Sequence, residues 1–560
     1  MPLPAISKRH TKKIMPTMKK RSPRLWLTAM IIASCLLSPR LGRSAGVTLV
    51  THGFEEDGYP DWVTAMAEQI ANYPTFPGTN FTAYRLVITY DNGYFYSVAR
   101  TNGAPPLTTD TGEIFVELDW SQLSGDIEDS YASTYGVASA VAYNLVQTNL
   151  VPELGGHALA EFPLHLIGHS RGGSLVAELS RQLGTNGLWI DHLTTLDPYP
   201  LNNDGNDDLL LASVVDAPAH YVYENVLFAD NYWQDLGAGL LALDPDGESV
   251  SGAYNRQLTD LDGGYGDNST YSIDHSNVHL WYFGTLDLDT PASDGPGGAS
   301  VGAFERVHWW NLYEDQGLFA GFYYSRIGGG DWSSTNRPLG SGYPAVVDGY
   351  NQYWNLGAGQ TNNNRTLLPA NSGAWPNLIR FDRADTNAVA AGQSFAVNYT
   401  CQWVSNSTAA ISIYLDTDLN PLNSNETLLT TVDAPGVTAP NLIYTNSALV
   451  TLPAANLSSG WHTLFAQITG GGRSRYLYAP QSIFVAANQP LTLDIAPFTG
   501  GQPQVGVTGV PGQKIILQSS QDLSHWQPIA TNTLATARVV FPLAGLPSGN
   551  MQFFRALLAN

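Results

Sequence analysis

The sequence predicts a mainly parallel β-sheet with helices on both faces, followed by domains built only from strands. Between residues 47 and 228, short apolar segments typical of buried strands alternate with segments of helical spacing. Beyond residue 377, apolar and polar residues alternate within segments separated by Asn, Ser and Pro, which is typical of half-buried strands. A chain of 560 residues is also too long to form a single hydrophobic core, and its length indicates about three to four domains.

Residues 1–45 differ in composition from the rest of the chain. They contain ten Lys or Arg and no Asp or Glu, and the apolar run from Leu25 to Leu37 precedes small residues near Gly46. This pattern predicts an export signal that is too short to span a membrane. Cys35 follows Ile-Ala-Ser as in bacterial lipoprotein signals, so a membrane tether through a lipidated Cys35 is the alternative to plain removal. We therefore expect a secreted or cell-surface protein of bacterial origin.

Charge and cysteine content narrow the classes of partner. The net charge of −22 argues against binding to nucleic acid. Only Cys401 remains once Cys35 is removed, so we expect no intrachain disulfide. No His or Cys pairs stand at ligand spacing, and we expect neither a metal nor a cofactor.

The first half of the chain supplies the sheet. A strand at 47–50 runs into the turn Thr-His-Gly-Phe, and the expected elements that follow are a helix at 61–73, strands at 86–90 and 113–120, a helix at 135–146, a strand at 164–167, a helix at 174–183, and strands at 190–197 and 220–228. Such a sheet places its chemistry at the carboxyl ends of its strands.

Ser170 occupies the sharp turn between the strand at 164–167 and the helix at 174–183. Gly168 and Gly172 flank it at two residues on either side, which lets strand and helix pass closely while the serine adopts strained geometry. We expect Ser170 to be a nucleophile; the alternative is an ordinary glycine-rich turn.

Asp197 ends the next strand, 27 residues beyond Ser170, and Pro198 follows it. A serine hydroxyl needs a neutral imidazole to remove its proton, and the imidazole needs a carboxylate to hold one tautomer. We expect Asp197 to be that carboxylate; the alternative is an aspartate that only begins a turn.

Five short motifs occur in a fixed order along this part of the chain. They are THGF (51–54) with DW (61–62), LDW (118–120), HLIGHS (165–170), TLDP (195–198) and DHSNVHLWY (274–282). These motifs resemble the series of the α/β-hydrolase lipases, most closely the pancreatic and lipoprotein lipase type, and the resemblance covers residues 47–282. It implies an α/β-hydrolase fold and an acyl-enzyme reaction, although Ser-Arg-Gly-Gly replaces the family's usual Ser-Leu-Gly-Ala and the disulfide-closed lid is absent.

The resemblance also implies the remaining site residues. His275 precedes an aromatic pair at the family's interval and is expected to be the base, with His279 as the alternative. The backbone amides of Phe54 and Arg171 are the expected oxyanion donors, each worth about 3 kcal/mol of transition-state stabilisation.

The expected domains are the export signal (1–45), a catalytic α/β-hydrolase domain with aromatic-rich insertions (46–372), an Ig-like β-sandwich (373–486) and a C-terminal β module (487–560). Asp416, Asp418 and Asn420 resemble the start of a calcium loop. Pro421 and Thr427 stand where glycine and a bidentate glutamate are needed, so a hairpin loop is favoured. We expect the β domains to contact glycans or a cell surface.

Together these observations predict an exported serine hydrolase that cleaves carboxylic esters, of lipids or of other acyl compounds, including polymer-linked ones. Two alternatives remain. One is an amidase or peptidase that uses the same three side chains, and the other is a non-catalytic binding protein on the same scaffold.

Overall fold

The computed structural model describes most of the chain beyond its N-terminal segment. The described residues are 46–55, 58–72, 81–125, 132–203, 214–236, 245–266, 273–287, 289, 291–296, 298–309, 321–324, 365–369, 374–383, 388–439, 442–453, 457–480, 482–486, 491–499, 502–509, 514–536, 538–543 and 552–558. The expected export signal and Cys35 lie outside these residues, as does most of the aromatic-rich segment at 301–353. Within the described part of the chain, no helix has the length and apolar character needed to cross a bilayer.

An eight-stranded sheet forms the centre of the first half, in the order β3-β2-β4-β1-β5-β6-β7-β8. Strands β2 and β3 pair antiparallel, and all other neighbours pair parallel, so the sheet is mixed. The strands are β1 (Val47–Thr51), β2 (Thr82–Tyr90), β3 (Tyr94–Gly103), β4 (Ile114–Asp119), β5 (Leu164–His169), β6 (Ile190–Leu196), β7 (Val226–Gln234) and β8 (Tyr254–Leu258).

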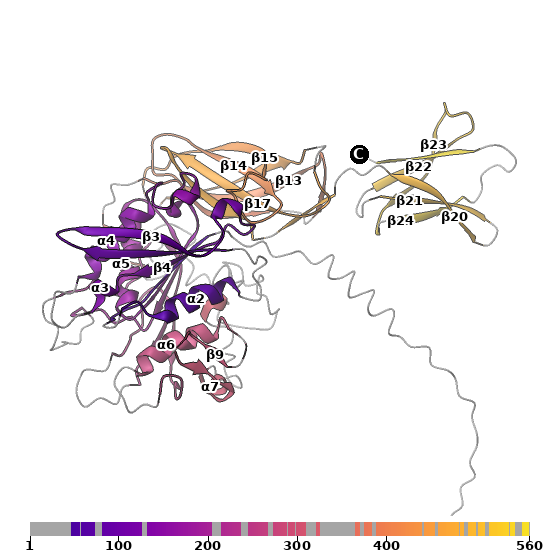
Figure 1. Ribbon diagram of the computed structural model, residues 1–560. Coiled ribbons are helices and arrows are strands. Elements are labelled where there is room, and N and C mark those ends of the chain that lie inside the picture. Colours follow the sequence, from indigo (N-terminus) through magenta and orange to yellow (C-terminus); the bar gives the residue numbers. More distant parts are fainter. Residues whose placement is uncertain are drawn as a thin grey trace, which may run out of the picture. The chain divides into compact units, whose positions relative to one another are not determined.

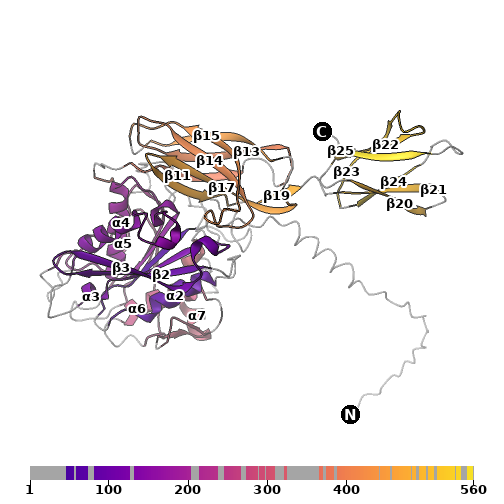
Figure 2. The same ribbon diagram turned by 45° about the horizontal axis from the view of Figure 1, so that its top comes forward.

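Helices cover both faces of this sheet (Figures 1 and 2). Apolar residues of α4 and α5 share one buried cluster with β1, β2 and β4, whereas α2 and α6 belong to a second cluster on the other face. The helices are α2 (Asp61–Ala71), α3 (Ser121–Ser124), α4 (Thr134–Leu145), α5 (Arg171–Thr185), α6 (Ile273–Gly284) and α7 (Ala303–Trp309), with 3-10 turns at Pro106–Thr108, Pro152–Leu154, Leu159–Glu161 and Gly321–Tyr324.

The parallel register brings the candidate residues to one edge of the sheet. Thr51 of β1 lies beside Gly168 of β5, and His169 of β5 lies beside Leu196 of β6. Ser170 and Asp197 therefore leave adjacent strands at the same level, at the carboxyl edge where open parallel sheets carry their sites.

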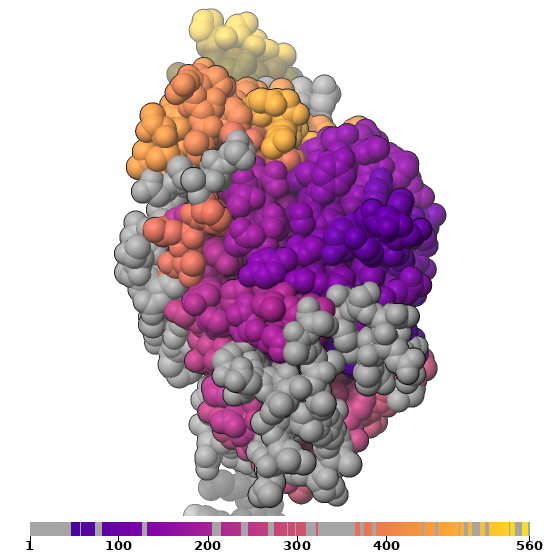
Figure 3. Space-filling view, turned by 90° about the vertical axis from the view of Figure 1, so that its left-hand side faces the viewer, coloured from indigo at the N-terminus to yellow at the C-terminus, as the bar shows by residue number. Residues whose placement is uncertain are grey.

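Strand β3 forms the outer edge of the sheet and is largely exposed. Tyr94, Phe95 and Tyr96 all keep more than a third of their surface accessible. The indigo part of the surface in Figure 3 belongs to the first hundred residues, beside the violet surface of later elements.

The second half of the chain is built from strands. A buried cluster between residues 378 and 485 joins a three-stranded and a six-stranded sheet into a sandwich, and a separate cluster unites two three-stranded sheets further on. The strands are β11 (Asn377–Arg383), β12 (Ala388–Ala390), β13 (Ser394–Gln402), β14 (Ala409–Asp416), β15 (Thr427–Ala434), β16 (Tyr444–Thr451), β17 (Gly460–Gly470), β18 (Arg473–Tyr478), β19 (Ile483–Ala486), β20 (Thr492–Thr499), β21 (Gln502–Thr508), β22 (Lys514–Ser520), β23 (Gln527–Thr533), β24 (Arg538–Pro542) and β25 (Phe553–Leu558), and a short ladder pairs β9 (Ala292–Ser293) with β10 (Ser300–Val301).

Polar side chains join the sandwich to the eight-stranded sheet. Arg475 of β18 contacts the Asp191 carboxylate of β6 at 2.5 Å, and both side chains are buried. The indole of Trp189 donates to the side-chain oxygen of Gln402 at 2.8 Å. The Asn420 amide donates to the carbonyls of Pro106 and Thr109.

The fold class expected from the sequence, an α/β hydrolase followed by all-β domains, is corrected by the structure. Among the described residues, 44% lie in strands and 19% in helices, and the large sheet is mixed. The prediction rests on the alternation of strands and helices in the first half. The second half consists of strands, so strands exceed helices when both halves are counted. The strand-only, sandwich-like part of the prediction is supported, and the domain boundaries stay predictions.

Candidate active site

Ser170 sits between β5 and α5 in a backbone conformation that side chains rarely adopt. Its φ of 59° and ψ of −129° are strained, and such strain is concentrated at functional sites. A Cβ added at Gly168 would lie 2.1 Å from the carbonyl oxygen of Gly172, so only glycine permits this crossing of strand and helix. The turn therefore directs Ser170 to the carboxyl edge of the sheet.

Asp197 lies directly after β6 and is completely buried. Its φ of 45° is also strained. The backbone N–H of Gln234 donates to Oδ1 at 2.9 Å, and the Gln234 side-chain amide donates to Oδ2 at 3.0 Å. A Cβ at Gly247 would come within 2.2 Å of Oδ1, so glycine is required for the loop to close over this carboxylate. The carboxylate is thus fixed in orientation before any substrate binds.

His275, near the start of α6, forms a direct pair with Asp197. Its Nδ1 lies 2.7 Å from Asp197 Oδ2, and the ring is almost fully buried. A carboxylate at this distance favours the tautomer with the proton on Nδ1, which leaves Nε2 as an acceptor. Among the described residues, Nε2 has no hydrogen-bond partner. The imidazole is therefore held as a base with its free nitrogen available.

Backbone contacts place Ser170 beside this pair. The neighbouring ring of His169 contacts the His275 carbonyl at 2.9 Å through Nε2, and the two rings lie 4.6 Å apart. The amide of Tyr199 donates to the Ser170 carbonyl at 3.1 Å, and the Tyr199 ring lies 6.2 Å from that of His275. These contacts hold the Ser170 turn and the start of α6 together, while among the described residues no hydrogen bond joins Ser170 to His275 Nε2.

His169 is a neutral supporting residue at this site. Burial, followed by the nearby imidazoles of His275 and His279, lowers the pKa of His169 well below its usual value. Because its Nε2 faces a carbonyl oxygen, the neutral ring must carry its proton there and donate it. His169 thereby fixes the backbone at which α6 presents His275.

The turn before α2 lies against the nucleophile. A Cβ added at Gly53 would lie 2.4 Å from Ser170 Cβ, so the turn that contains Gly53 and Phe54 lies in contact with the Ser170 turn. Burial lowers the pKa of His52 to about 4, which keeps its ring neutral. Its Nδ1 donates to the Gly53 carbonyl at 3.0 Å, and its Nε2 accepts the Trp120 amide at 3.3 Å. This tautomer holds the turn; the oxyanion role of the Phe54 and Arg171 amides stays a prediction.

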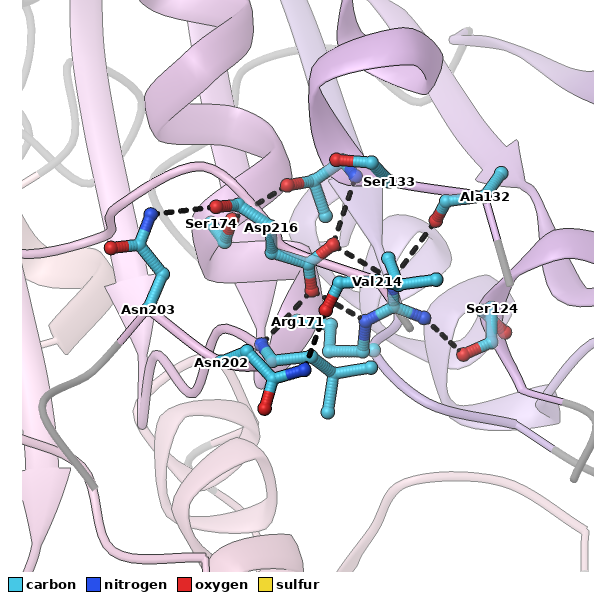
Figure 4. A network of polar contacts seen from close by, with 12 residues as sticks. Ser124, Ala132, Ser133, Arg171, Ser174, Asn202, Asn203, Val214 and Asp216 are labelled. Carbon is cyan, nitrogen blue, oxygen red and sulfur yellow. Dashed lines mark hydrogen bonds and ion pairs between the residues drawn. The ribbon is translucent and has the colours of Figure 1, made fainter. Parts of the chain in front are cut away.

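The Arg171 side chain forms a buried ion pair directly after the nucleophile. Its guanidinium bonds both oxygens of Asp216, at 2.7 and 2.9 Å, and donates to the carbonyls of Ser124 and Ala132 (Figure 4). Asp216 also accepts the Leu201 amide at 3.0 Å. One side chain therefore fastens three separate segments beside Ser170, a role that the sequence analysis did not assign to it.

His279, the alternative base, lies in a different environment. Its ring stacks on Trp62 with centroids 4.3 Å apart. Its Nδ1 comes within 3.2 Å of Asp294 Oδ2 but lacks the geometry of a hydrogen bond. The Tyr265 hydroxyl donates to the same oxygen at 2.7 Å. The structure thus gives His279 a packing environment and gives His275 the close carboxylate contact.

Besides the Arg171–Asp216 pair, the sequence analysis missed Gln234 and Gly247. Gln234 ends β7, the strand adjacent to that of Asp197, but the expected strand stopped at residue 228 and left Gln234 outside the sheet. Gly247 carries no local signal, because its close approach to Asp197 arises only in three dimensions.

The segment at Asp416–Asn420 forms a loop between the antiparallel strands β14 and β15. Asp416 accepts the Tyr478 hydroxyl at 2.6 Å, and Asp418 accepts the amides of Asn423 and Asn425. Within the described ranges, no cluster of His, Cys, Asp or Glu could hold a metal ion. The loop's polar groups therefore bond to the protein itself.

Comparisons with known proteins assign no function to the chain. No family model matches it, and no curated protein matches it. Solved structures similar to parts of it include the CARDB domain of a Pyrococcus furiosus protein (9% identity, TM-score 0.14, 20% of this chain and 96% of that one). A second is a CFA/I fimbrial chaperone–tip adhesin complex (13% identity, TM-score 0.12, 32% of this chain and 97% of that one). A third is the human OSCAR ligand-binding domain (13% identity, TM-score 0.16, 33% of this chain and 88% of that one).

These findings correct the resemblance to the α/β-hydrolase lipases. No family model and no curated protein supports that resemblance, and among the described residues strand exceeds helix, at 44% against 19%. Short motifs can recur at turns in proteins of different families, because the backbone geometry of a turn favours glycine and proline. With TM-scores this low, no function is taken from the β domains either, and any function must be argued from the site.

Proposed function

We propose that this chain is an exported serine hydrolase that cleaves carboxylic esters through an acyl-enzyme intermediate. One observation carries the proposal: a buried imidazole is bonded to a buried carboxylate through Nδ1, while its Nε2 has no partner among the described residues. A strained serine lies in the adjoining turn. This combination suits removal of the serine proton during attack on an acyl group.

In the proposed reaction Ser170 attacks the ester carbonyl while His275 takes its proton through Nε2. Asp197 stabilises the imidazolium that forms and holds the ring in place, since Gln234 fixes both carboxylate oxygens. The oxyanion receives hydrogen bonds from the backbone amides of Phe54 and Arg171. His275 then protonates the leaving alcohol. In the second half of the reaction, water attacks the acyl-enzyme while His275 takes its proton, and His275 returns that proton to Ser170 as the acid leaves.

The test uses the protein from residue 46 to residue 560 with p-nitrophenyl esters from acetyl to palmitoyl and a fluorophosphonate probe. We expect turnover and covalent labelling, both lost in Ser170→Ala. Ser180→Ala is the matched control, because Ser180 is a buried serine of α5 whose hydroxyl, among the described residues, bonds only the Ala177 carbonyl of its own helix. Equal labelling of wild type and Ser170→Ala would contradict the proposal.

The same experiment separates the two alternatives. Faster cleavage of p-nitroanilides than of the matching esters would favour the amidase or peptidase, which must protonate a leaving amine. Wild-type protein inert to every substrate and to the probe would favour the binding protein. Chain-length preference among the esters would separate lipid substrates from short acyl groups.

Location and accessory contacts belong to the same proposal. The basic and apolar character of residues 1–45 supports export, either with release of the protein or with a tether at Cys35. The strand-only domains beyond residue 377 would then contact glycans or the cell surface. Labelling of intact cells with a probe that cannot enter them would test this location.

A further inference from the structure

Glu113 is a buried carboxylate at the amino edge of the eight-stranded sheet. It precedes β4, and only 1% of its surface is accessible. The backbone N–H of Gly46, which precedes the neighbouring β1, donates to Oε2 at 2.7 Å. The Thr48 hydroxyl donates to Oε1 at 3.2 Å. Glu113 is therefore held against Gly46 and Thr48, at the start of β1.

The other buried carboxylates of this sheet each face a cation or an imidazole within 3.0 Å. Glu113 is different, because among the described residues its hydrogen-bond donors are neutral. An unpaired buried carboxylate is costly, and burial raises the pKa of Glu113 to about 8. The paired examples are Glu117 with Arg85, Asp191 with Arg475 and Asp230 with His192.

We propose that the chain is cut between Ala45 and Gly46, and that the freed Gly46 ammonium forms a buried ion pair with the Glu113 carboxylate. Hydrolysis by an endopeptidase of the export route adds one water: Ala45 gains the carboxylate, and Gly46 gains the amine, which takes up a proton. The nitrogen that becomes charged is the one already 2.7 Å from Oε2. The cut after Ala45 thus provides the positive charge that Glu113 lacks among its other hydrogen-bond donors.

The surroundings of Gly46 fit a chain terminus that is fixed in place. The Gly46 carbonyl accepts the Ile114 amide at 2.9 Å, and the Val47 amide donates to the Pro163 carbonyl at 2.8 Å. A Cβ at Gly46 would lie 3.1 Å from the Pro163 oxygen, which favours glycine there. The ion pair forms at the amino edge of the strands, opposite Ser170, and the inference does not depend on the proposed ester hydrolysis.

The first experiment is N-terminal sequencing, with intact mass, of the protein exported from cells that express the full 560-residue chain. We expect the mature protein to begin at Gly46. A mature protein that begins at Ala45, at Cys35 or at any other residue would overturn the proposal.

The second experiment compares two purified proteins, one beginning at Gly46 and one beginning at Ala45. We expect the Gly46 form to melt about 3 °C or more higher at pH 7, because only it places an ammonium against Glu113. Glu113→Gln should remove this difference. Glu117→Gln is the matched control: it alters a buried carboxylate of the same sheet that pairs with Arg85, and it should leave the difference intact.

The pH dependence gives a readout that simple packing would not produce. Without a cation, Glu113 has a folded pKa above its unfolded value, so its cost to stability is absent in acid and grows as pH rises from about 4.5 to 8. The ammonium cancels that cost. The difference in melting temperature should therefore vanish near pH 4 and increase as pH rises toward about 8. A difference that is independent of pH, or one that survives Glu113→Gln, would overturn the proposal.

Discussion

Helix α6 presents two histidines one turn apart, each beside a buried aspartate, and the two pairs differ in how they are held. His275 meets Asp197 at 2.7 Å, while His279 approaches Asp294 at 3.2 Å without hydrogen-bond geometry. Asp197 is oriented by Gln234, whereas Asp294 is engaged by the Tyr265 hydroxyl. A neighbouring carboxylate alone does not make a histidine a base. The carboxylate must also be aligned to hold one tautomer.

The largest expected effect compares the two histidines directly. His275→Ala should lower kcat for ester hydrolysis by about 10⁴-fold or more, because the serine loses its proton acceptor. His279→Ala should change kcat by less than about 10-fold, since it removes a ring stacked on Trp62. Steady-state kinetics of both variants measure the difference. The reverse order would transfer the base role to His279.

The second effect compares the two aspartates. Asp197→Asn should reduce kcat by about 10⁴-fold with little change in KM, because the amide favours the wrong imidazole tautomer. Asp294→Asn should retain most of the wild-type kcat. Kinetics over pH 5 to 9 provide the measurement, and equal losses in the two variants would remove the distinction between the pairs.

A smaller effect separates positioning at the site from general stability. Arg171→Met combined with Asp216→Asn removes a buried ion pair beside Ser170, and we expect a loss of about 10²-fold in kcat from misplacement of the serine turn. Arg475→Met with Asp191→Asn removes a buried pair of the same kind away from Ser170. That second double variant should lower the melting temperature while kcat stays within about 3-fold of wild type. Similar kcat losses in both double variants would mean that Arg171 acts only through stability.

The smallest effect concerns acid stability and involves neither pair directly. Burial, then the neighbouring imidazole of His192, lowers the pKa of His165 well below 6.5, so the folded protein keeps this ring neutral. The unfolded chain binds the extra proton below pH 6.5, and stability should fall there by about 1.4 kcal/mol per pH unit for this group. His165→Gln should flatten that slope in denaturation between pH 7.5 and 5. Substitution of the exposed His525 should not flatten it.

Part of this arrangement could be predicted from local sequence. Glycine spacing around Ser170 and the strand that ends at Asp197 both leave local signals, because backbone turns limit which residues fit. The choice between His275 and His279 could not be made from the residues alone, since it depends on which carboxylate the folded chain brings near each ring. The prediction of fold class was wrong because it rested on the alternation of strands and helices in the first half, whereas strands outweigh helices over the described residues.

The buried ion pairs were beyond prediction for a related reason. Arg171 and Asp216 are separated by 45 residues, and Arg475 and Asp191 by 284. Nothing in the spacing of such residues marks them as partners, because the contact forms only when distant elements pack. Glu113 shows the same limit, since its environment is recognisable only once β1 and β4 lie side by side.

The contact between Arg475 and Asp191 decides where this protein can be divided. The Arg475 guanidinium also donates to the Trp189 carbonyl, and Asp191 accepts the Leu164 amide at the start of the strand that leads to Ser170. A shortened protein ending at residue 372 would keep Asp191 and lose its cation, and it would expose Trp189 and Leu227 where Ile379 now covers them. The sandwich is therefore part of the folding unit that carries the serine, and the two cannot be exchanged as independent modules.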